Sequence, residues 1–276
     1  MYLKINSKIY APDTIEEYFR LIESINDFKP VAGGTDLTVK MKEGSEHYKN
    51  LILLNRIKEL KKIEINKEYI FIGATNTFSE LINNSAVKNM TSLFQAFQNI
   101  GSPQIRNLAT VGGNIVNASP AADSPVPLIL YDAIAVVANK NGYREIFIKD
   151  FFKDSYKTRL EKNELLTGIK IKKSNFKKDE FIKIGKRKAV VISRINLAYG
   201  VTESNSWRIV TGAVTPFPVR MLQTENLICS GNATREKIEE SVLKDILLHT
   251  GFRPSFKYKI PVIRDILYKK YTGQER

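Results

Sequence analysis

The chain has 276 residues, of which 43% are hydrophobic, and its 43 Lys and Arg against 29 Asp and Glu give a net charge of +14. This length can bury one large core or two smaller ones. No apolar run approaches the ~20 residues of a membrane span, and the opening stretch MYLKINSKIYAPD lacks the apolar core of a signal peptide. We therefore expect a cytoplasmic protein without a membrane partner.

Cysteine and histidine are too scarce to build a metal centre. The single cysteine, Cys229, rules out an internal disulfide and any iron–sulfur or zinc site ligated by several thiolates of this chain. The two histidines, His47 and His249, lie far apart in the sequence. We therefore expect no metal in this chain and an intracellular, reducing environment.

The positive charge suggests nucleic acid, an acidic protein partner or an anionic ligand. The basic residues are spread along the chain, and the densest stretches, IKIKKSNFKK and IKIGKRK, alternate like strands with solvated lysines. Aromatic residues are not interleaved with arginine as they are in RNA-binding sheets. We therefore expect no nucleic-acid partner.

The first third of the chain predicts alternating strands and helices. Residues 13–25 carry apolar side chains at helical spacing after Asp13, which we take as the N-cap. The βαβ order favours a small parallel or mixed sheet. The expected elements are a strand at 7–12, a helix at 13–25, a strand at 29–34, a short helix at 35–44 and a buried strand at 50–55.

The middle third predicts antiparallel strands and several short helices. An Asn-Gly turn lies inside the hairpin pattern of residues 133–148, and Pro125 and Pro127 suit the first turn of a buried helix. The expected elements are strands at 61–66 and 68–74, helices at 78–82, at 91–100 and after 124, the 133–148 hairpin, and strands at 163–173 and 179–188.

The last third predicts a separate α+β unit of about three strands and two or three helices. Gly231 suits the end of one helix, and Thr234 suits the N-cap of the next, with Lys237 where a capping box has an acid. The expected elements are antiparallel strands within 194–214 and helices at 219–231, 234–251 and 260–273. We place the boundary of this unit near residue 175.

The stretch VAGGTD, residues 31–36, follows a predicted strand and precedes a predicted helix. Gly33 and Gly34 can adopt positive φ and let backbone N–H groups approach an anion, and Thr35 adds a hydroxyl donor. The spacing is neither the GxGxxG of a Rossmann site nor the GK[ST] of a Walker loop. Alone, this first loop is either an ordinary turn or a phosphate cradle.

A second stretch, ATVGGN, residues 109–114, offers N–H and hydroxyl donors of the same kind. Two such loops suit a pyrophosphate held from two sides. Asp123 lies nine residues beyond Asn114, and its carboxylate either accepts hydrogen bonds from sugar hydroxyls or caps a helix. The combination favours a dinucleotide bound in an extended form.

These residues carry a family resemblance. The motifs AGGTDLTVKMK, GSPQIRNLATVGGNIVNASPAADSPVPLILYDA, KIGKRKAVVISRINLA and GAVTPFPVR occur in this order. The chain thereby resembles, over nearly its whole length, the FAD-binding or medium subunit of the xanthine dehydrogenase and carbon monoxide dehydrogenase family of molybdenum hydroxylases.

The resemblance implies an α+β fold in two parts. Residues 1–174 would form an FAD-binding domain of PCMH type, with a small βαβ subdomain at about 1–55 and a larger mixed-sheet subdomain at 56–174. Residues 175–276 would form a C-terminal α+β domain of the CO dehydrogenase flavoprotein type, with a three-stranded antiparallel sheet and helices.

In that family both loops hold the FAD pyrophosphate. The resemblance gives this role in the first loop to Lys29, Pro30, Val31, Ala32, Gly33, Gly34, Thr35 and Asp36. In the second loop it gives the role to Ala109, Thr110, Gly112, Gly113 and Asn114. Asp123 would accept from hydroxyls of the ribose or ribityl chain.

The resemblance also implies residues beside the flavin ring. Ile100 and Val116 would face the isoalloxazine with aliphatic groups. Leu166 would touch the flavin side or the adenine side of the cofactor. Lys183 would lie near the flavin carbonyl edge, where a cation stabilises the negative charge of the reduced ring, and Arg187 would lie close to the same edge. Read without the resemblance, both are solvated residues on an exposed strand.

One departure from the family concerns charge near this edge. Many relatives carry an acid after the arginine, as in RRxxDIA, whereas this chain has KRKAVVISR, with Val190 and Val191. Any pairing between Lys183 and that acid is lost. This departure bears on the flavin potential and on the access of a nicotinamide to this face.

The resemblance implies a place in electron transfer. The molybdopterin would sit on a large partner subunit and two [2Fe–2S] clusters on a small one, and electrons would pass through FAD in this chain to NAD+ or another acceptor. No side chain here is expected to act as a catalytic nucleophile or base. Two alternatives stay open: a free-standing FAD-dependent oxidoreductase of the same fold class, and a basic binding protein without enzymatic activity.

Overall fold

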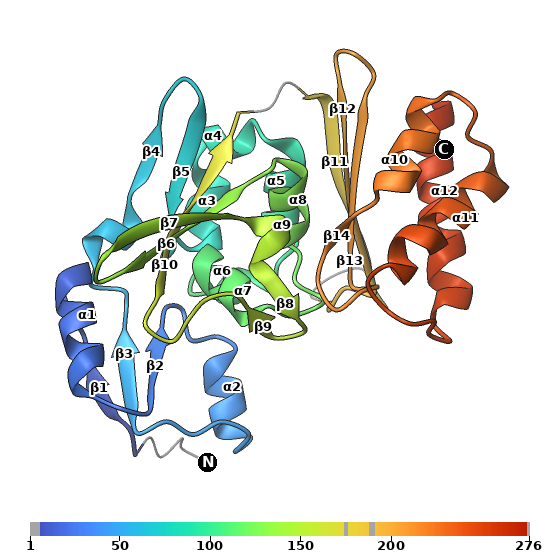
Figure 1. Ribbon diagram of the computed structural model, residues 1–276. Helices are drawn as coiled ribbons and strands as arrows, with labels where there is room; N and C mark the ends of the chain where they lie inside the picture. The colour runs from blue at the N-terminus through green and yellow to red at the C-terminus, as the bar shows by residue number, and fades with distance from the viewer. Residues whose placement is uncertain (1–5, 174–175, 188–190, 275–276) are drawn as a thin grey trace.

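The computed structural model describes residues 6–173, 176–187 and 191–274. Its three larger sheets have three, five and four strands and follow one another along the chain, each with helices of its own (Figure 1). The α+β class predicted from the sequence is confirmed.

The first sheet is a small parallel one with the strand order β1-β3-β2, in agreement with the small parallel or mixed sheet that the βαβ pattern favours. Its helix α1 is capped by Thr14, whose side chain accepts from the amide of Glu17. The predicted cap, Asp13, instead pairs with Arg56 at 2.8 Å. The elements are β1 (Lys8–Tyr10), α1 (Ile15–Ser24), β2 (Phe28–Val31), α2 (Leu37–Lys42) and β3 (Asn50–Leu53).

The second sheet is antiparallel, in the order β4-β5-β10-β6-β7. Its strands are β4 (Ile63–Ile65), β5 (Tyr69–Gly73), β6 (Ile134–Asn139), β7 (Gly142–Phe147) and β10 (Leu165–Lys172). Asn139 pairs with Gly142, so the hairpin turn is Lys140–Asn141, one residue before the predicted Asn-Gly turn.

Short helices and a small ribbon accompany this sheet. They are η1 (Lys58–Lys61), α3 (Phe78–Asn83), α4 (Ser85–Lys88), α5 (Thr91–Gln98), α6 (Pro103–Arg106), α7 (Val111–Asn117), α8 (Pro125–Leu130), α9 (Ile148–Phe151), β8 (Phe152–Asp154) and β9 (Lys157–Thr158). As predicted, two prolines begin the buried helix α8. Helices α5 and α8 lie between the five-stranded and four-stranded sheets (Figure 1).

The third sheet has the order β11-β12-β13-β14, with β11 (Phe176–Ile184), β12 (Ile195–Thr202), β13 (Trp207–Gly212) and β14 (Val219–Arg220). It has four strands rather than three, because β14 has only two residues and therefore leaves no alternating pattern in the sequence. Helices α10 (Leu222–Cys229), α11 (Arg235–Leu247) and α12 (Phe256–Thr272) cover one face (Figure 1). Helix α12 begins four residues before the predicted start and contains Pro261.

The five-stranded and four-stranded sheets share one apolar core. Phe181, Ala198 and Val210 of the four-stranded sheet are buried in the same cluster as the helices of the central unit. Asp179 on β11 accepts hydrogen bonds at 2.6 Å from the amide of Ser92 and at 2.6 Å from the hydroxyl of Tyr131. The predicted boundary at residues 174–175 lies outside the described residues, and the division into domains stays a prediction.

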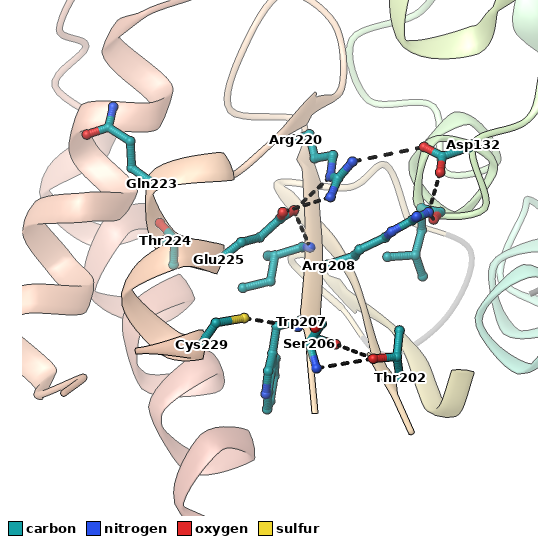
Figure 2. A network of polar contacts seen from close by, with 12 residues as sticks. Asp132, Thr202, Ser206, Trp207, Arg208, Arg220, Gln223, Thr224, Glu225 and Cys229 are labelled. Carbon is teal, nitrogen blue, oxygen red and sulfur yellow. Dashed lines mark hydrogen bonds and ion pairs between the residues drawn. The ribbon is translucent and has the colours of Figure 1, made fainter. Parts of the chain in front are cut away.

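A polar network reinforces this junction (Figure 2). Arg208 on β13 donates to the carboxylate of Asp132, just after α8. Arg220 donates twice to Glu225 on α10, both at 2.9 Å, and its other nitrogen lies 4.0 Å from Asp132. Burial raises the pKa of Glu225, although Arg220 and the amide of Ile209 oppose that shift. The network joins β13, β14 and α10 to the segment after α8 through charged groups.

Candidate functional site

A cavity of about 940 Å³ lies where the three-stranded unit meets the central unit. Its wall combines the loop between β2 and α2, the region around α7, the stretch from Tyr156 to Leu166 and part of β11 with the segment after it. Nearly all the site residues predicted from the sequence line this one cavity. They are Lys29, Pro30, Val31, Ala32, Gly33, Gly34, Thr35, Asp36, Ile100, Ala109, Thr110, Gly112, Gly113, Asn114, Val116, Asp123, Leu166 and Lys183.

Arg187 is the exception. It is exposed, does not line the cavity, and has an interaction partner of its own. Its predicted place near the flavin edge is therefore not supported by the position it has here.

The first glycine loop leaves its backbone donors open. Among the described residues, no acceptor is found for the amides of residues 33–36 or for the hydroxyl of Thr35. Gly34 has φ +68°, a left-handed conformation that favours glycine. A Cβ on Gly33 would lie 2.0 Å from the carbonyl oxygen of Leu108, so this loop packs directly on the backbone leading into the second.

The second glycine stretch is the first turn of helix α7 rather than an open loop. Thr110 is its N-cap, and the Thr110 hydroxyl accepts from the amide of Gly113 at 3.1 Å. The other amides of the turn also have partners: Val111 to Asn76, Gly112 to Ala74 and Asn114 to Thr110. The expectation of free N–H groups is therefore not met at residues 111–114. Among the described residues, the donors left to this stretch are the backbone amide and the hydroxyl proton of Thr110 and the side-chain amide of Asn114.

Asp123 is the centre of a buried polar cluster. One carboxylate oxygen, Oδ1, accepts from Ser193 at 2.6 Å and from the side chain of Asn196 at 2.8 Å. The other, Oδ2, accepts from the ammonium of Lys183 at 2.6 Å. A carboxylate has about four acceptor positions, which leaves one for a ligand. Helix α8 takes no side-chain cap from its N-cap residue, Ser124, and the cap interpretation of Asp123 is wrong.

The side chain of Lys183 is only 9% exposed, so its interpretation as a solvated residue is wrong. Besides Asp123, it donates to the carbonyl of Asn99 at 2.9 Å. Asp123 thus supplies the negative partner that the sequence lacks at positions 190 and 191. Val190 lies outside the described residues, and Val191 lines the cavity.

Lys40 on α2 links the two sides of the cavity. Its ammonium lies 2.8 Å from Asp36, 3.2 Å from the side-chain oxygen of Asn117 at the end of α7, and 5.0 Å from the ring centre of Tyr156. Partial burial lowers the pKa of Lys40, but hydrogen bonds and charge attraction from Asp36 and Glu46 raise it above its ordinary value. These contacts connect the three-stranded unit to the central one beside the first loop.

The remaining wall is largely aliphatic. Ile100 and Leu166 are 9% and 3% exposed, and Val116 is 36% exposed. Tyr18 adds a fully buried ring, whose pKa is raised by burial and whose hydroxyl has no partner among the described residues. At the Leu166 end, two hydrogen bonds from Arg144 outweigh burial and lower the pKa of Glu164.

Sequence reasoning missed Lys40, Tyr156, Ser193 and Asn196. Asn196 could have been found from the sequence, because it interrupts the apolar run of a strand, and a polar residue at such a position needs a buried partner. Lys40 and Tyr156 had none, since their partners are set by the packing of distant segments. Within the described residues, no cluster of His, Cys, Asp or Glu suits a metal ion, and no helix has the length and apolarity that a membrane span requires.

The sequence matches known proteins along most of its length. A family model described as the FAD binding domain in molybdopterin dehydrogenase matches residues 4–173. The nicotinate dehydrogenase FAD-subunit of Eubacterium barkeri is 30% identical, over 96% of this chain and 95% of that protein. The xanthine dehydrogenase FAD-binding subunit of Escherichia coli O157:H7 is 29% identical, over 93% of this chain and 91% of that protein.

Solved structures share the fold. A chain of carbon monoxide dehydrogenase from Hydrogenophaga pseudoflava superposes with a TM-score of 0.86 at 26% identity, covering 96% of this chain and 95% of that one. A chain of quinoline 2-oxidoreductase from Pseudomonas putida 86 gives a TM-score of 0.86 at 19% identity, over 97% of each chain, which supports the fold alone.

Proposed function

Because the chain belongs to the family of FAD-binding domains in molybdopterin dehydrogenases, we propose that it holds FAD in the 940 Å³ cavity and passes electrons from [2Fe–2S] clusters on a partner chain to NAD+ or another acceptor. The observation that carries the proposal is the gathering in one cavity of two glycine stretches about 80 residues apart in the sequence. As a member of this family, the chain is an oxidoreductase component.

The residues present fit such a cofactor. The open amides of residues 33–36 suit the pyrophosphate, because unpaired N–H groups at a glycine turn bind anionic oxygens. A Cβ on Gly33 would collide with the Leu108 backbone, so the close approach of the two loops needs glycine there. Lys183 offers a cation, and Ile100 with Val116 offers an aliphatic surface for the flavin ring.

The chain's own residues bind, orient and shield, while bound FAD exchanges electrons singly or in pairs and so couples iron–sulfur carriers to a two-electron acceptor. The first loop would anchor the pyrophosphate, and the Lys183 ammonium would favour negative charge beside it. Asp123, with one acceptor position left, would accept from one hydroxyl of the ribose or ribityl chain.

Partner chains complete the proposed complex. The relatives are named as FAD subunits or medium chains, including the medium chain of carbon monoxide dehydrogenase from Hydrogenophaga pseudoflava. We accordingly expect a large molybdopterin-binding subunit and a small [2Fe–2S] subunit to associate with this chain. The net charge of +14 would favour an acidic docking surface on one of them.

The test is the absorbance of the purified full-length chain, before and after incubation with FAD and gel filtration. We expect flavin bands and about one FAD per chain. A folded chain that stays colourless with excess FAD contradicts the proposal. Co-expression with the neighbouring genes then separates the assignments: iron and molybdenum eluting with this chain support a subunit role, and a flavoprotein that elutes alone supports a free-standing oxidoreductase.

A further inference from the structure

Ser193 in the cavity wall and Asn196 behind it hold Asp123, and Asp123 in turn holds Lys183. We propose that Ser193 and Asn196 are positioning residues that fix the Lys183 ammonium at the cavity wall and thereby raise the reduction potential of bound FAD. This inference rests on the proposed function, because it concerns the same cavity. It assigns a role to two residues that need not touch the cofactor themselves.

The cluster draws together separate parts of the chain. Asp123 precedes α8, Lys183 lies on β11, and Asn196 lies on β12, which pairs with β11 so that Lys183 is opposite Asn196. Ser193 comes from the segment between these strands and is 6% exposed, and Asn196 is 0% exposed. Little water reaches these groups, so each hydrogen bond fixes its neighbour more strongly than it would at the surface.

The side-chain amide of Asn196 has only one orientation that satisfies its neighbours. Its Nδ2 donates both to Asp123 and to the carbonyl of Ala122, at 2.8 and 3.0 Å, and both partners are acceptors. Its own oxygen is buried without a partner among the described residues. A Cβ on Gly212 would lie 2.4 Å from that oxygen. An unpaired buried acceptor costs stability. We therefore assign this amide the role of holding the Asp123 carboxylate, not that of stabilising the fold.

The carboxylate in turn directs the ammonium. An ammonium has three N–H donors. Two donors of Lys183 bond to Asp123 and to the carbonyl of Asn99, and the third has no acceptor among the described residues. Because the three bonds are tetrahedral, fixing two of them fixes the third. Lys183 lines the cavity, so the open donor is available to an occupant.

The field of an ion pair depends on its geometry, because the two charges partly cancel. With Asp123 fixed by Ser193 and Asn196, the cation is held at the cavity wall, where it favours the more negative, reduced state of an occupant. Without either donor, the carboxylate turns more freely, and the ammonium that it holds loses its fixed place at the wall. This change favours the oxidised state and lowers the potential.

The experiment measures the reduction potential of FAD bound to the full-length chain, by titration against a reference dye, in Ser193→Ala and Asn196→Ala. We expect each substitution to shift the equilibrium three- to tenfold towards oxidised flavin, which corresponds to about 14–30 mV for a two-electron couple. Ser193→Thr keeps the hydroxyl and should restore the potential of the unmodified chain.

A double-mutant cycle with Lys183→Met separates positioning from a general effect on the fold. If Ser193 acts through Lys183, Ser193→Ala should not change the potential further once the ammonium is absent. Ser241→Ala is the matched control, because Ser241 is also buried but bonds to Ile238 on α11, away from the cavity. It should leave the potential unchanged.

Two results would overturn the inference alone. In the first, the unmodified chain binds FAD and both alanine variants keep its potential. In the second, the shift caused by Ser193→Ala is equally large in the Lys183→Met background. A folded, unmodified chain that takes up no FAD contradicts the proposed function itself, and the two failures are therefore distinguishable.

Discussion

The two glycine stretches lie against each other in one cavity wall, yet they use their backbone donors in opposite ways. In the first, the amides of residues 33–36 have no acceptor among the described residues. In the second, the amides of residues 111–114 bond to carbonyls or to the Thr110 cap. The same pair of glycines therefore makes an anion-binding turn in one place and a packed helix start in the other.

Close packing explains why both stretches need glycine. A Cβ on Gly33 would lie 2.0 Å from the carbonyl oxygen of Leu108, and a Cβ on Gly112 would lie 2.5 Å from the Cβ of Ala74. The first glycine brings the two stretches together, and the second seats α7 against the end of β5. Contact between backbones is thus common to both, whereas open donors belong to the first alone.

The largest effect is expected from Gly33→Ala. The added methyl group meets backbone on the facing stretch, so the two segments must separate, at a cost of about 3 kcal/mol in the free energy of unfolding. The open amides move with the first loop, and we expect FAD content to fall to near zero. Urea denaturation and flavin absorbance measure the two effects.

Gly251→Ala is the control for that change, since no heavy atom lies within 4 Å of a Cβ at this position. It should leave both quantities unchanged. A Gly33→Ala protein with the stability and FAD content of the unmodified chain would mean that the two stretches do not pack as described.

The next largest effect is expected from Gly113→Val. A Cβ here lies 2.8 Å from the Thr110 hydroxyl and 3.8 Å from the Ala32 side chain, so valine displaces the cap and fills the space between the stretches. FAD affinity should fall at least 100-fold, about 2.7 kcal/mol. Unchanged flavin content in the purified variant would place the second stretch outside the binding site.

Gly34→Ala and Gly44→Ala form a matched pair that separates an effect on the open amides from an effect on the neighbouring helix. Both glycines have left-handed backbones, with φ +68° and +76°, and flank the same helix, α2. Each substitution should lower stability by about 1–2 kcal/mol. Calorimetric titration should show weaker FAD binding, by about tenfold, only for Gly34→Ala. Equal weakening in both would indicate an effect through the helix rather than through the open amides.

The smallest effects come from the two threonines, and they should have opposite signatures. Thr110→Ala removes an N-cap and should lower the stability of the FAD-free chain by about 1 kcal/mol. Thr35→Ala removes a hydroxyl that has no partner among the described residues, so stability should hold while FAD affinity falls by about 1 kcal/mol. Chemical denaturation and FAD titration of both variants are the measurements, and a reversed pattern would exchange the roles assigned to the two stretches.

The sequence predicted most elements, because alternation and helical spacing are local signals. It predicted a small parallel or mixed sheet for the first third, which is parallel, and the hairpin of β6 and β7, whose turn lies one residue earlier than predicted. It missed β14, which is too short to show a period, and it placed the start of α12 at residue 260, four residues late. It chose Asp13 over Thr14 as a cap because neighbouring residues of both types suit that role.

The sequence predicted which residues line the cavity better than it predicted which of them are joined by hydrogen bonds. Glycine stretches at both predicted places line the cavity, since a glycine pair marks a special backbone. Ser193 and Asn196 reach Asp123 from more than 65 residues away in the sequence. Lys40 meets Asn117 across a similar separation. Such pairings depend on how sheets stack, which no local pattern records.

The core shared by the five-stranded and four-stranded sheets bears on how this protein can be handled in the laboratory. The match to the family model ends at residue 173, and a gene shortened to that segment would still encode the whole of that match. The encoded fragment would lack Phe181, Ala198 and Val210, which fill its interior, and Asp179, which binds Tyr131. Its bare apolar flank would invite aggregation, so soluble expression calls for the longer reading frame.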